Sequence, residues 1–254
     1  MLKITKQFFK WVLIFTLFQT RWVIAEQAHT RLVSNDCIIE PSRVVNISSP
    51  VEGILRKITV ERGDQVKAQQ IIARLDARVE QASVVLAKEK ANFNQRKVQR
   101  NKALYAKKLI SIHDKDEMET ESLISKLELR QAQAILAQRV IKTPVSGIVV
   151  NRFFNEGEFV SSDPIVKIAQ INPLYVEVIL PVTVIGQVKT NMKATVFPQL
   201  PVGGEYSAEV IIVDKIVDAA SSTIGVRLLL PNPDNRLPAG LKCRVDFNQV
   251  VTER

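Results

Sequence analysis

The side chains of this chain that are best suited to chemistry are few and widely separated. Its two histidines, His29 and His113, have no cysteine or carboxylate cluster around them at the spacing that metal ligands need. Gly63 and the pair Gly203-Gly204 fall in expected hairpin turns and precede no helix, so they make no phosphate-binding loop. We therefore expect no enzyme activity, no metal site and no cofactor, and we look for a function in binding or assembly.

A pattern typical of a strand, a turn and a second strand is written twice. Residues 49–75 read SPVEGILRKITVERGDQVKAQQIIARL, and residues 143–169 read TPVSGIVVNRFFNEGEFVSSDPIVKIA. The offset between the copies is constant, and the glycines match as Gly53 with Gly147 and Gly63 with Gly157. Such glycines mark turns that need positive φ or a close backbone approach. Because neither half can bury its apolar face alone, we expect the halves to pair as a small β-sandwich.

The residues between the copies predict a protruding helical hairpin. Residues 78–108 contain no Gly or Pro, and apolar residues recur there at intervals of seven, which is typical of a coiled-coil seam: Val84, Ala91, Val98 and Tyr105. The expected returning helix carries one stripe of Leu129, Ala132, Leu136 and Val140, with Leu127, Ala134 and Ile141 beside it. At 1.5 Å per residue, an arm of about 31 residues is roughly 45 Å long.

A second row of apolar residues, Val79, Leu86 and Phe93, also repeats every seven positions. One antiparallel partner would not cover both rows, so this pattern favours lateral packing against another molecule. The alternative is an isolated hairpin whose second row is surface of low polarity. Basic residues outnumber acidic ones between residues 78 and 108, but the stretch holds only two aromatic residues, Phe93 and Tyr105, which are not interleaved with its basic residues as in nucleic-acid-binding segments, and the returning helix is acidic. A solvated coiled-coil face explains this better than nucleic-acid binding.

The segment after Asn172-Pro173 has a different pattern. Short alternating or apolar runs lie between Pro, Gly and Asn turns, at residues 174–180, 193–197, 208–213, 225–230 and 243–247. This spacing favours a small antiparallel barrel.

Two half-motifs, a helical hairpin between them and a β-rich tail together resemble the periplasmic adaptor subunits of tripartite efflux and secretion pumps, also called membrane fusion proteins or HlyD-like proteins. The resemblance runs from about residue 32 to 247 and rests on order and spacing. It implies an elongated, mainly β chain with an α-helical coiled-coil hairpin, a split biotinyl/lipoyl-like β-sandwich and a small antiparallel β-barrel. The expected bounds are a signal peptide at 1–25, a barrel at 32–45 and 171–250, lipoyl-like halves at 46–76 and 143–170, and a hairpin at 77–142.

The resemblance also implies specific residues. Adaptors of this kind use an Arg-x3-Leu-x6-Ser pattern at the hairpin tip to meet an outer-membrane exit channel, and the matching positions here are Arg100, Leu104 and Ser111. Arg100 can donate several hydrogen bonds to exposed carbonyls, and Leu104 can fill a shallow groove. A capping role of Ser111 at the second helix is compatible with docking. The resemblance further implies that residues 32–45 complete the barrel and bring Cys37 near Cys243, as a disulfide or as two separate buried thiols.

The N-terminus predicts export. Lys3, Lys6 and Lys10 precede the apolar run 11–18, and Val23-Ile24-Ala25 fits a signal-peptidase site before Glu26. An uncleaved anchor is the alternative, but the run is far shorter than the roughly 20 apolar residues of a spanning helix. We expect a periplasmic protein that associates peripherally with the inner membrane.

The expected function is that of an adaptor bridging an inner-membrane transporter, favoured as the resistance-nodulation-division (RND) type, to an outer-membrane exit channel, assembled as a homo-oligomeric ring such as a trimer or hexamer. An adaptor of an ATP-driven (ABC-type) exporter or secretion system is the alternative. A lipoyl or biotinyl carrier is a remote one, because the long insertion replaces the hairpin that would carry the modified lysine. Larger efflux adaptors continue into a further membrane-proximal domain, whereas this sequence reads to Arg254, so we expect the barrel to serve in docking.

Overall fold

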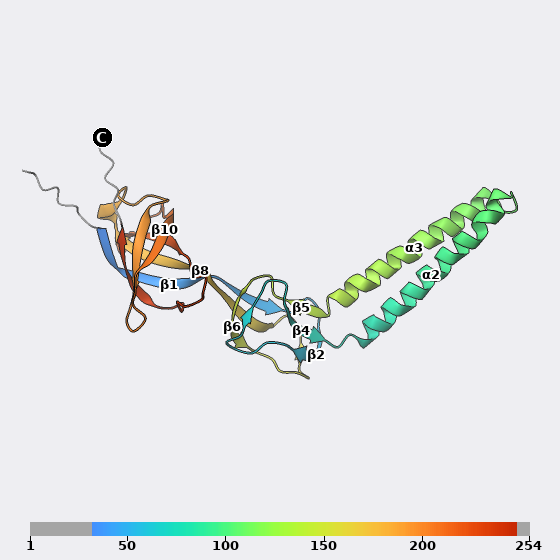
Figure 1. Cartoon of the computed structure of the whole chain (residues 1–254), viewed down its shortest axis with the longest axis horizontal. Coiled ribbons are helices and arrows are strands. Elements are labelled where there is room, and N and C mark those ends of the chain that lie inside the picture. Colours follow the sequence, from blue (N-terminus) through green and yellow to red (C-terminus); the bar gives the residue numbers. More distant parts are fainter. Residues whose placement is uncertain (1–31, 248–254) are drawn as a thin grey trace, which may run out of the picture.

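A computed structural model describes residues 32–247, which lie in one extended body with the barrel at one end, the sandwich in the middle and the hairpin at the other end (Figure 1). The expected signal peptide lies outside the described residues. The N-terminal half contains β1 (Leu32–Ser48), β2 (Gly53–Ile58), β3 (Gln65–Val66), β4 (Ile71–Leu75), α2 (Arg78–Ala106) and α3 (Ile112–Ala137). The C-terminal half contains β5 (Val140–Lys142), β6 (Gly147–Arg152), β7 (Phe159–Val160), β8 (Pro164–Pro181), a 3-10 turn η1 (Val182–Val184), β9 (Lys193–Pro198), β10 (Tyr206–Val213), β11 (Thr223–Leu230) and β12 (Lys242–Phe247).

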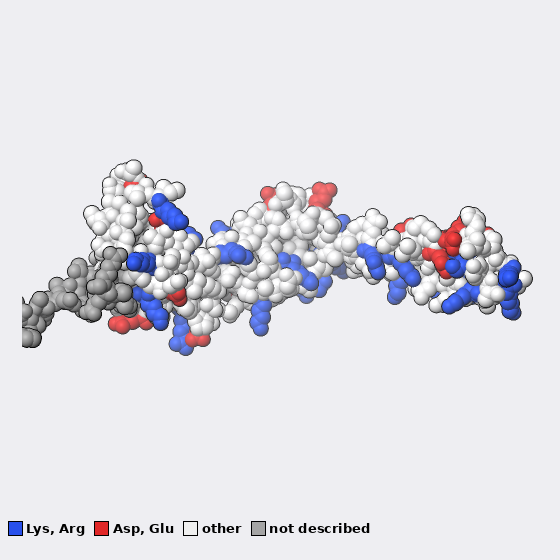
Figure 2. Space-filling model, turned by 90° about the horizontal axis from the view of Figure 1, so that it is seen from above, with Lys and Arg blue, Asp and Glu red and all other residues white. Residues whose placement is uncertain are grey.

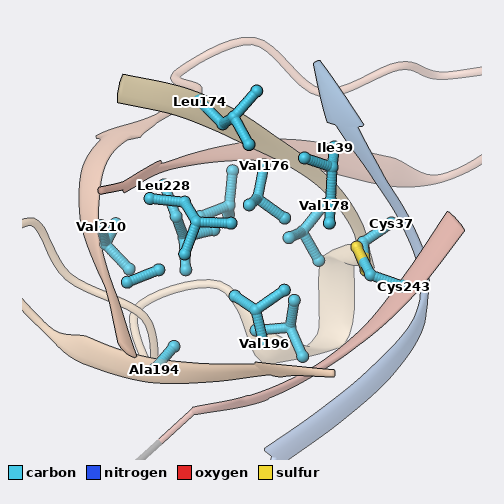
Figure 3. Close-up of a cluster of buried hydrophobic side chains, with 14 of the residues drawn as sticks. Cys37, Ile39, Leu174, Val176, Val178, Ala194, Val196, Val210, Leu228 and Cys243 are labelled. Atoms are coloured by element: carbon cyan, nitrogen blue, oxygen red, sulfur yellow. A yellow bond between two sulfur atoms is a disulfide. The ribbon is translucent and has the colours of Figure 1, made fainter. Parts of the chain in front are cut away.

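The barrel is a closed sheet of six antiparallel strands in the order β1-β12-β9-β10-β11-β8, with β8 pairing back to β1. Closure leaves no free edge in this ring of strands. Strict alternation builds its interior: along β11 every second residue is buried, from Ile224 to Leu230. Figure 3 shows the aliphatic side chains of several strands, among them Val176, Val196 and Leu228, meeting inside the ring.

Two strands join the barrel to the sandwich. β1 has 17 residues and β8 has 18, and they pair with each other from Cys37 opposite Val178 to Ser48 opposite Pro164. The expected boundaries at 45/46 and 170/171 therefore fall inside continuous strands. The register of this ladder shifts between Pro41 and Arg43, while β1 stays paired with β8 on both sides of the shift.

The sandwich shows how the two copies of the repeat complete each other. β2 pairs with β4 of its own copy and β7 of the other, and β6 pairs with β8 and with β3. Corresponding residues make corresponding contacts: Gly53 lies opposite Val160, and Gly147 lies opposite Val66. The two copies thus exchange their short strands about an approximate two-fold axis, and one core with residues from both sheets is buried between them.

The repeated glycines have two different structural reasons. Gly63 and Gly157 have φ of +95° and +91°, which side chains rarely adopt. Gly147 is needed for space, because a Cβ there would collide with the carbonyl group of Ala169. At Gly53 a Cβ would lie 2.7 Å from Nη1 of Arg139. Two of the four are therefore turn residues, and two permit close approaches.

The hairpin consists of α2 and α3, which are 29 and 26 residues long. The expected seam residue Ala91 is buried, and Val84, Val98 and Tyr105 are half-buried. One expectation was wrong: α3 ends at Ala137, so Val140 and Ile141 are not on the returning helix. They form β5, where Val140 pairs with Arg74 of β4 and Ile141 is buried in the sandwich core. The pairing with β4 and the burial of Ile141 in the sandwich core stabilise a strand here more than the apolar stripe favours a longer helix.

Candidate functional site

The apex of the hairpin is built by a tight turn between α2 and α3. Lys108 has φ of +59°, and the backbone N–H of Leu109 donates to the carbonyl of Leu104 at 3.0 Å. These features are typical of a helix C-terminus that reverses direction within a few residues. The turn leaves two large apolar side chains in solvent, since Leu109 and Ile112 are 67% and 63% exposed.

Ser111 begins α3 and holds a reciprocal pair of hydrogen bonds with Asp114. The Ser111 hydroxyl accepts from the Asp114 N–H at 3.1 Å, and the Asp114 carboxylate accepts from the Ser111 N–H at 3.0 Å and from its hydroxyl at 2.7 Å. This is a capping box. The hydroxyl and the backbone N–H of Ser111 lower the pKa of the Asp114 carboxyl. The expected docking residue Ser111 is therefore already used in shaping the turn.

Arg100 and Leu104 lie one helical turn apart on α2 and are both exposed. Within residues 32–247 the Arg100 guanidinium makes no hydrogen bond or ion pair, so its donors are available to another molecule. The structure thus presents Arg100 and Leu104 together near the apex, with the Ser111 cap across the turn. Lys102, Lys107 and Lys108 are also exposed here, and Figure 2 shows basic side chains at this end of the molecule.

A groove runs between the two helices on another side of the apex. It has a volume of about 490 Å³ and is lined by residues that include Val98, Tyr105, Ile110 and Met118. Nζ of Lys115 lies 5.3 Å from the centre of the Tyr105 ring. Lys102, which lines this groove, is two positions from Leu104 and so points to nearly the opposite side of α2. No separate pattern in the sequence marks this groove, because Val98 and Tyr105 of its lining already belong to the seam row.

The flanks of the hairpin are more apolar than its seam. The buried residues between the helices are small or polar: Ala91, Asn94, Ser122 and Ser125. In contrast, Val79, Leu86 and Phe93 on α2 are 75%, 74% and 53% exposed, and Leu123, Ile124, Leu127 and Ile135 on α3 are also exposed. Ion pairs Lys90–Glu128 at 2.8 Å and Lys97–Glu121 at 3.0 Å tie the helices at a fixed register. The described residues therefore leave these large apolar side chains of the flanks half or more exposed, or nearly so.

The structure brings together the two cysteines that lie at opposite ends of the described chain. Cys37 of β1 lies directly opposite Cys243 of β12, with Cα atoms 5.1 Å apart and an S–S distance of 2.04 Å (Figure 3). The pair borders the barrel core.

Within residues 32–247, no group of three or more His, Cys, Asp and Glu side chains is arranged as a possible metal site. His113 is exposed in the first turn of α3. None of the helices in this part of the chain combines the length and the apolar character that crossing a membrane requires.

The strand-exchanged sandwich with its inserted hairpin and the closed barrel match two family models that adjoin in the chain. Residues 43–172 match the family model for the RND membrane fusion protein barrel-sandwich hybrid domain, and residues 173–250 match that for the CusB-like β-barrel domain. The chain belongs to the family of RND membrane fusion proteins.

Curated relatives include two named proteins of Pseudomonas. The multidrug/solvent efflux pump periplasmic linker protein MepA of Pseudomonas putida is 26% identical over 234 residues, covering 82% of this chain and 60% of that protein. Multidrug resistance protein MexA of Pseudomonas aeruginosa is 24% identical over 228 residues, covering 84% of this chain and 60% of MexA. The chain therefore spans about 60% of the length of these relatives.

Solved structures share the fold. A MacA–MexA chimeric protein that contains the α-hairpin domain of Pseudomonas aeruginosa MexA superposes with a TM-score of 0.73 at 23% identity, covering 87% of this chain and 82% of the chimera. The membrane fusion protein Spr0693 of Streptococcus pneumoniae R6 gives a TM-score of 0.67 at 15% identity, covering 86% of this chain and 98% of Spr0693.

Proposed function

We propose that this chain is a periplasmic adaptor that couples an inner-membrane transporter to an outer-membrane exit channel in a tripartite efflux pump. The observation that carries the proposal is the hairpin: two long helices project from the sandwich and expose unpaired Arg100, Leu104 and an apolar turn at their far end. Family membership supports it, as do relatives named as efflux pump periplasmic linkers. Membership of the RND membrane fusion protein family favours a transporter of the RND class over an ATP-driven exporter.

In this proposal the two ends of the molecule have different partners. β1 begins at Leu32 at the end of the barrel that is remote from the hairpin (Figure 1). A chain exported by an N-terminal signal is released at the inner membrane, so the barrel faces that membrane and associates with it peripherally. The apex then faces the exit channel, with Arg100 and Leu104 in contact and Ser111 both capping α3 and bordering the contact.

We infer that several copies assemble side by side as a ring. Burying an exposed Leu or Phe side chain contributes about 1.5–3 kcal/mol, and both helices expose several such side chains on their flanks. The flanks differ, because α2 carries one row and α3 another, so the contact between copies is heterologous and a closed ring satisfies all of them.

The proposed role is mechanical and includes no catalytic step and no cofactor. Carrier domains present a lysine on a tight turn between their halves, whereas here β4 and β5 pair with each other and the hairpin is inserted between them. The intact mass of protein isolated from the periplasm is expected to contain no lipoyl or biotinyl addition.

The adaptor function is tested by deleting the gene and restoring it on a plasmid, with efflux of a fluorescent dye and photo-crosslinking from the apex measured together. We expect deletion to abolish efflux, and a crosslinker at Lys107 to capture an outer-membrane protein while one at Lys57 of the sandwich does not. Unchanged efflux after deletion, or capture of no outer-membrane protein from any apex position, refutes the proposal.

A further inference from the structure

Two short links attach the hairpin to the sandwich, and they set the direction in which the hairpin points. Only Asp76 and Ala77 separate β4 from α2, and only Gln138 and Arg139 separate α3 from β5. Ala77 at the start of α2 provides no side-chain cap. For a 29-residue helix, a rotation of about 10° at the root moves the apex by about 7–8 Å. A displacement of that size separates the apex from any fixed partner.

One residue, Arg139, contacts the parts of the chain that meet at this root. Nη2 of Arg139 donates to Oε1 of Glu80 in the first turn of α2 at 2.7 Å, and Nη1 donates to the carbonyl of Glu52 in the sandwich at 2.8 Å. The backbone carbonyl of Arg139 accepts from the N–H of Leu75 at the end of β4, at 2.9 Å. Arg139, which lies in the link after α3, therefore contacts α2, the turn before β2 and the end of β4.

The low exposure of the Arg139–Glu80 ion pair and its position at two helix ends both stabilise it. The side chains of Arg139 and Glu80 are 21% and 14% exposed, and no other ion pair between described residues has both partners so little exposed. Glu80 lies at the N-terminus of α2 and Arg139 follows the C-terminus of α3, so each charge also complements a helix dipole. Gly53 leaves the space that the guanidinium fills.

We propose that Arg139, with Glu80 and the Glu52 carbonyl, is a clamp that fixes the direction of the hairpin relative to the sandwich. Arg139 is a positioning residue: it lies beside the first turn of α2, at the opposite end of the hairpin from the apex, and it determines where the apex lies. The contact lies beside an open hollow of about 620 Å³ lined by Asp76, Leu86 and others, so the side chains have room to separate when the clamp is broken. The inference that the clamp helps the chain to bridge two partners rests on the proposed adaptor function. The inference that the clamp fixes the direction of the hairpin does not rest on it.

The test measures the position of the apex directly. Spin labels are placed on the purified mature chain at Lys107→Cys in the apex turn and Lys57→Cys on β2, both exposed positions, and their distance distribution is recorded by double electron–electron resonance. Arg139→Gln and Glu80→Gln are expected to broaden the distribution and add a second maximum. Gly53→Ala is expected to broaden it too, because the added methyl group displaces the guanidinium without removing a charge.

The matched control is Arg78→Gln, which breaks the ion pair between Arg78, the first residue of α2, and Asp76 of the link before it. We expect its distribution to equal that of the wild type. Circular dichroism verifies that each variant keeps its helices. An unchanged distribution in Arg139→Gln overturns the proposal, and if that variant fails to fold, the same criterion applies to Glu80→Gln. Because no transporter is needed for the measurement, loss of the clamp and loss of the adaptor function are separate results.

Discussion

Arg100 is an exposed cation at the apex with no partner in the described chain. If it donates to carbonyls of an exit channel, Arg100→Asp replaces several donors with an acceptor-only anion, and each lost charged hydrogen bond costs roughly 1.5–3 kcal/mol. The loss repeats in every copy of a ring, so export is expected to fail while the fold persists. Dye efflux and crosslinking from the apex measure the loss, with Lys88→Asp at mid-helix as the control. Full efflux and crosslinking in Arg100→Asp would remove this residue from the docking surface.

The capping box gives the apex a dependence on pH. The folded pKa of Asp114 is lowered by its hydrogen bonds from Ser111, so the carboxylate stabilises the turn above its unfolded pKa, and this stabilisation disappears as the pH falls through the lower, folded pKa. Hydrogen exchange at the start of α3 is expected to be faster in Asp114→Asn than in the wild type at pH 7. The difference should shrink as the pH falls below the ordinary pKa of an aspartate, because the wild-type carboxylate then takes up its proton. A difference that stays constant over that fall in pH would contradict this assignment.

Removing the cap itself tests the second role of Ser111. Ser111→Ala is expected to destabilise the first turn of α3 by about 0.5–2 kcal/mol, measured by hydrogen exchange. Ser111→Asn keeps an uncharged N-cap side chain of good propensity beside the Asp114 carboxylate but removes the hydroxyl, and it should retain most of the stability. If Ser111→Asn keeps the turn but loses crosslinking to the exit channel, the hydroxyl is also a contact. If it keeps both, capping is the whole role of Ser111.

At the scale of the hairpin, the seam contains a polar residue where an apolar one is expected. Asn94 is 3% exposed, and its Nδ2 has no hydrogen-bond partner in the structure. Because an unsatisfied buried donor costs about 1–3 kcal/mol, Asn94→Leu is expected to raise the thermal midpoint of the helical signal. The control is Asn101→Leu, which removes an amide that donates to the Lys97 carbonyl at 2.8 Å and so should not stabilise. A lower midpoint in Asn94→Leu would show that the amide is satisfied in solution.

Some elements of this fold can be predicted from the sequence and others cannot. The sandwich can be predicted from the repeat, because Gly53 and Gly147 take part in strand pairings that recur in both halves. The end of α3 was not predictable from the period alone, since Val140 lies four residues after Leu136 and continues its helical stripe. Asn94 was missed for a related reason, because polar residues at helical spacing usually face solvent. The clamp at Arg139 joins residues far apart in the chain, and no local pattern records such a contact.

At the scale of the whole molecule, Cys37 and Cys243 close a loop that contains nearly all of the described chain, with a sequence separation of 206. A disulfide there constrains the unfolded chain, and its removal by Cys243→Ala is expected to lower the free energy of unfolding of the barrel by about 2–5 kcal/mol. The hairpin should keep its helical content, because α2 and α3 pack on each other and not on the barrel. Non-reducing peptide mapping of periplasmic protein checks the bond, and two free thiols in that preparation would contradict it.

The proposed ring depends on the row of Val79, Leu86 and Phe93, which runs along one side of α2 and is left more than half exposed by the described residues. Phe93→Glu places a charge in a contact that is apolar in the assembled ring, whereas in the isolated chain the side chain is 53% exposed and the cost is small. We therefore expect the variant to fold as the wild type does but to sediment as a monomer at concentrations where the wild type associates.

Val85→Glu is the matched control, since Val85 is 61% exposed but lies off this row. Because a ring repeats the same contact in each copy, a small loss per interface has a large effect on closure. Association of Phe93→Glu equal to that of the wild type would show that copies meet through another surface.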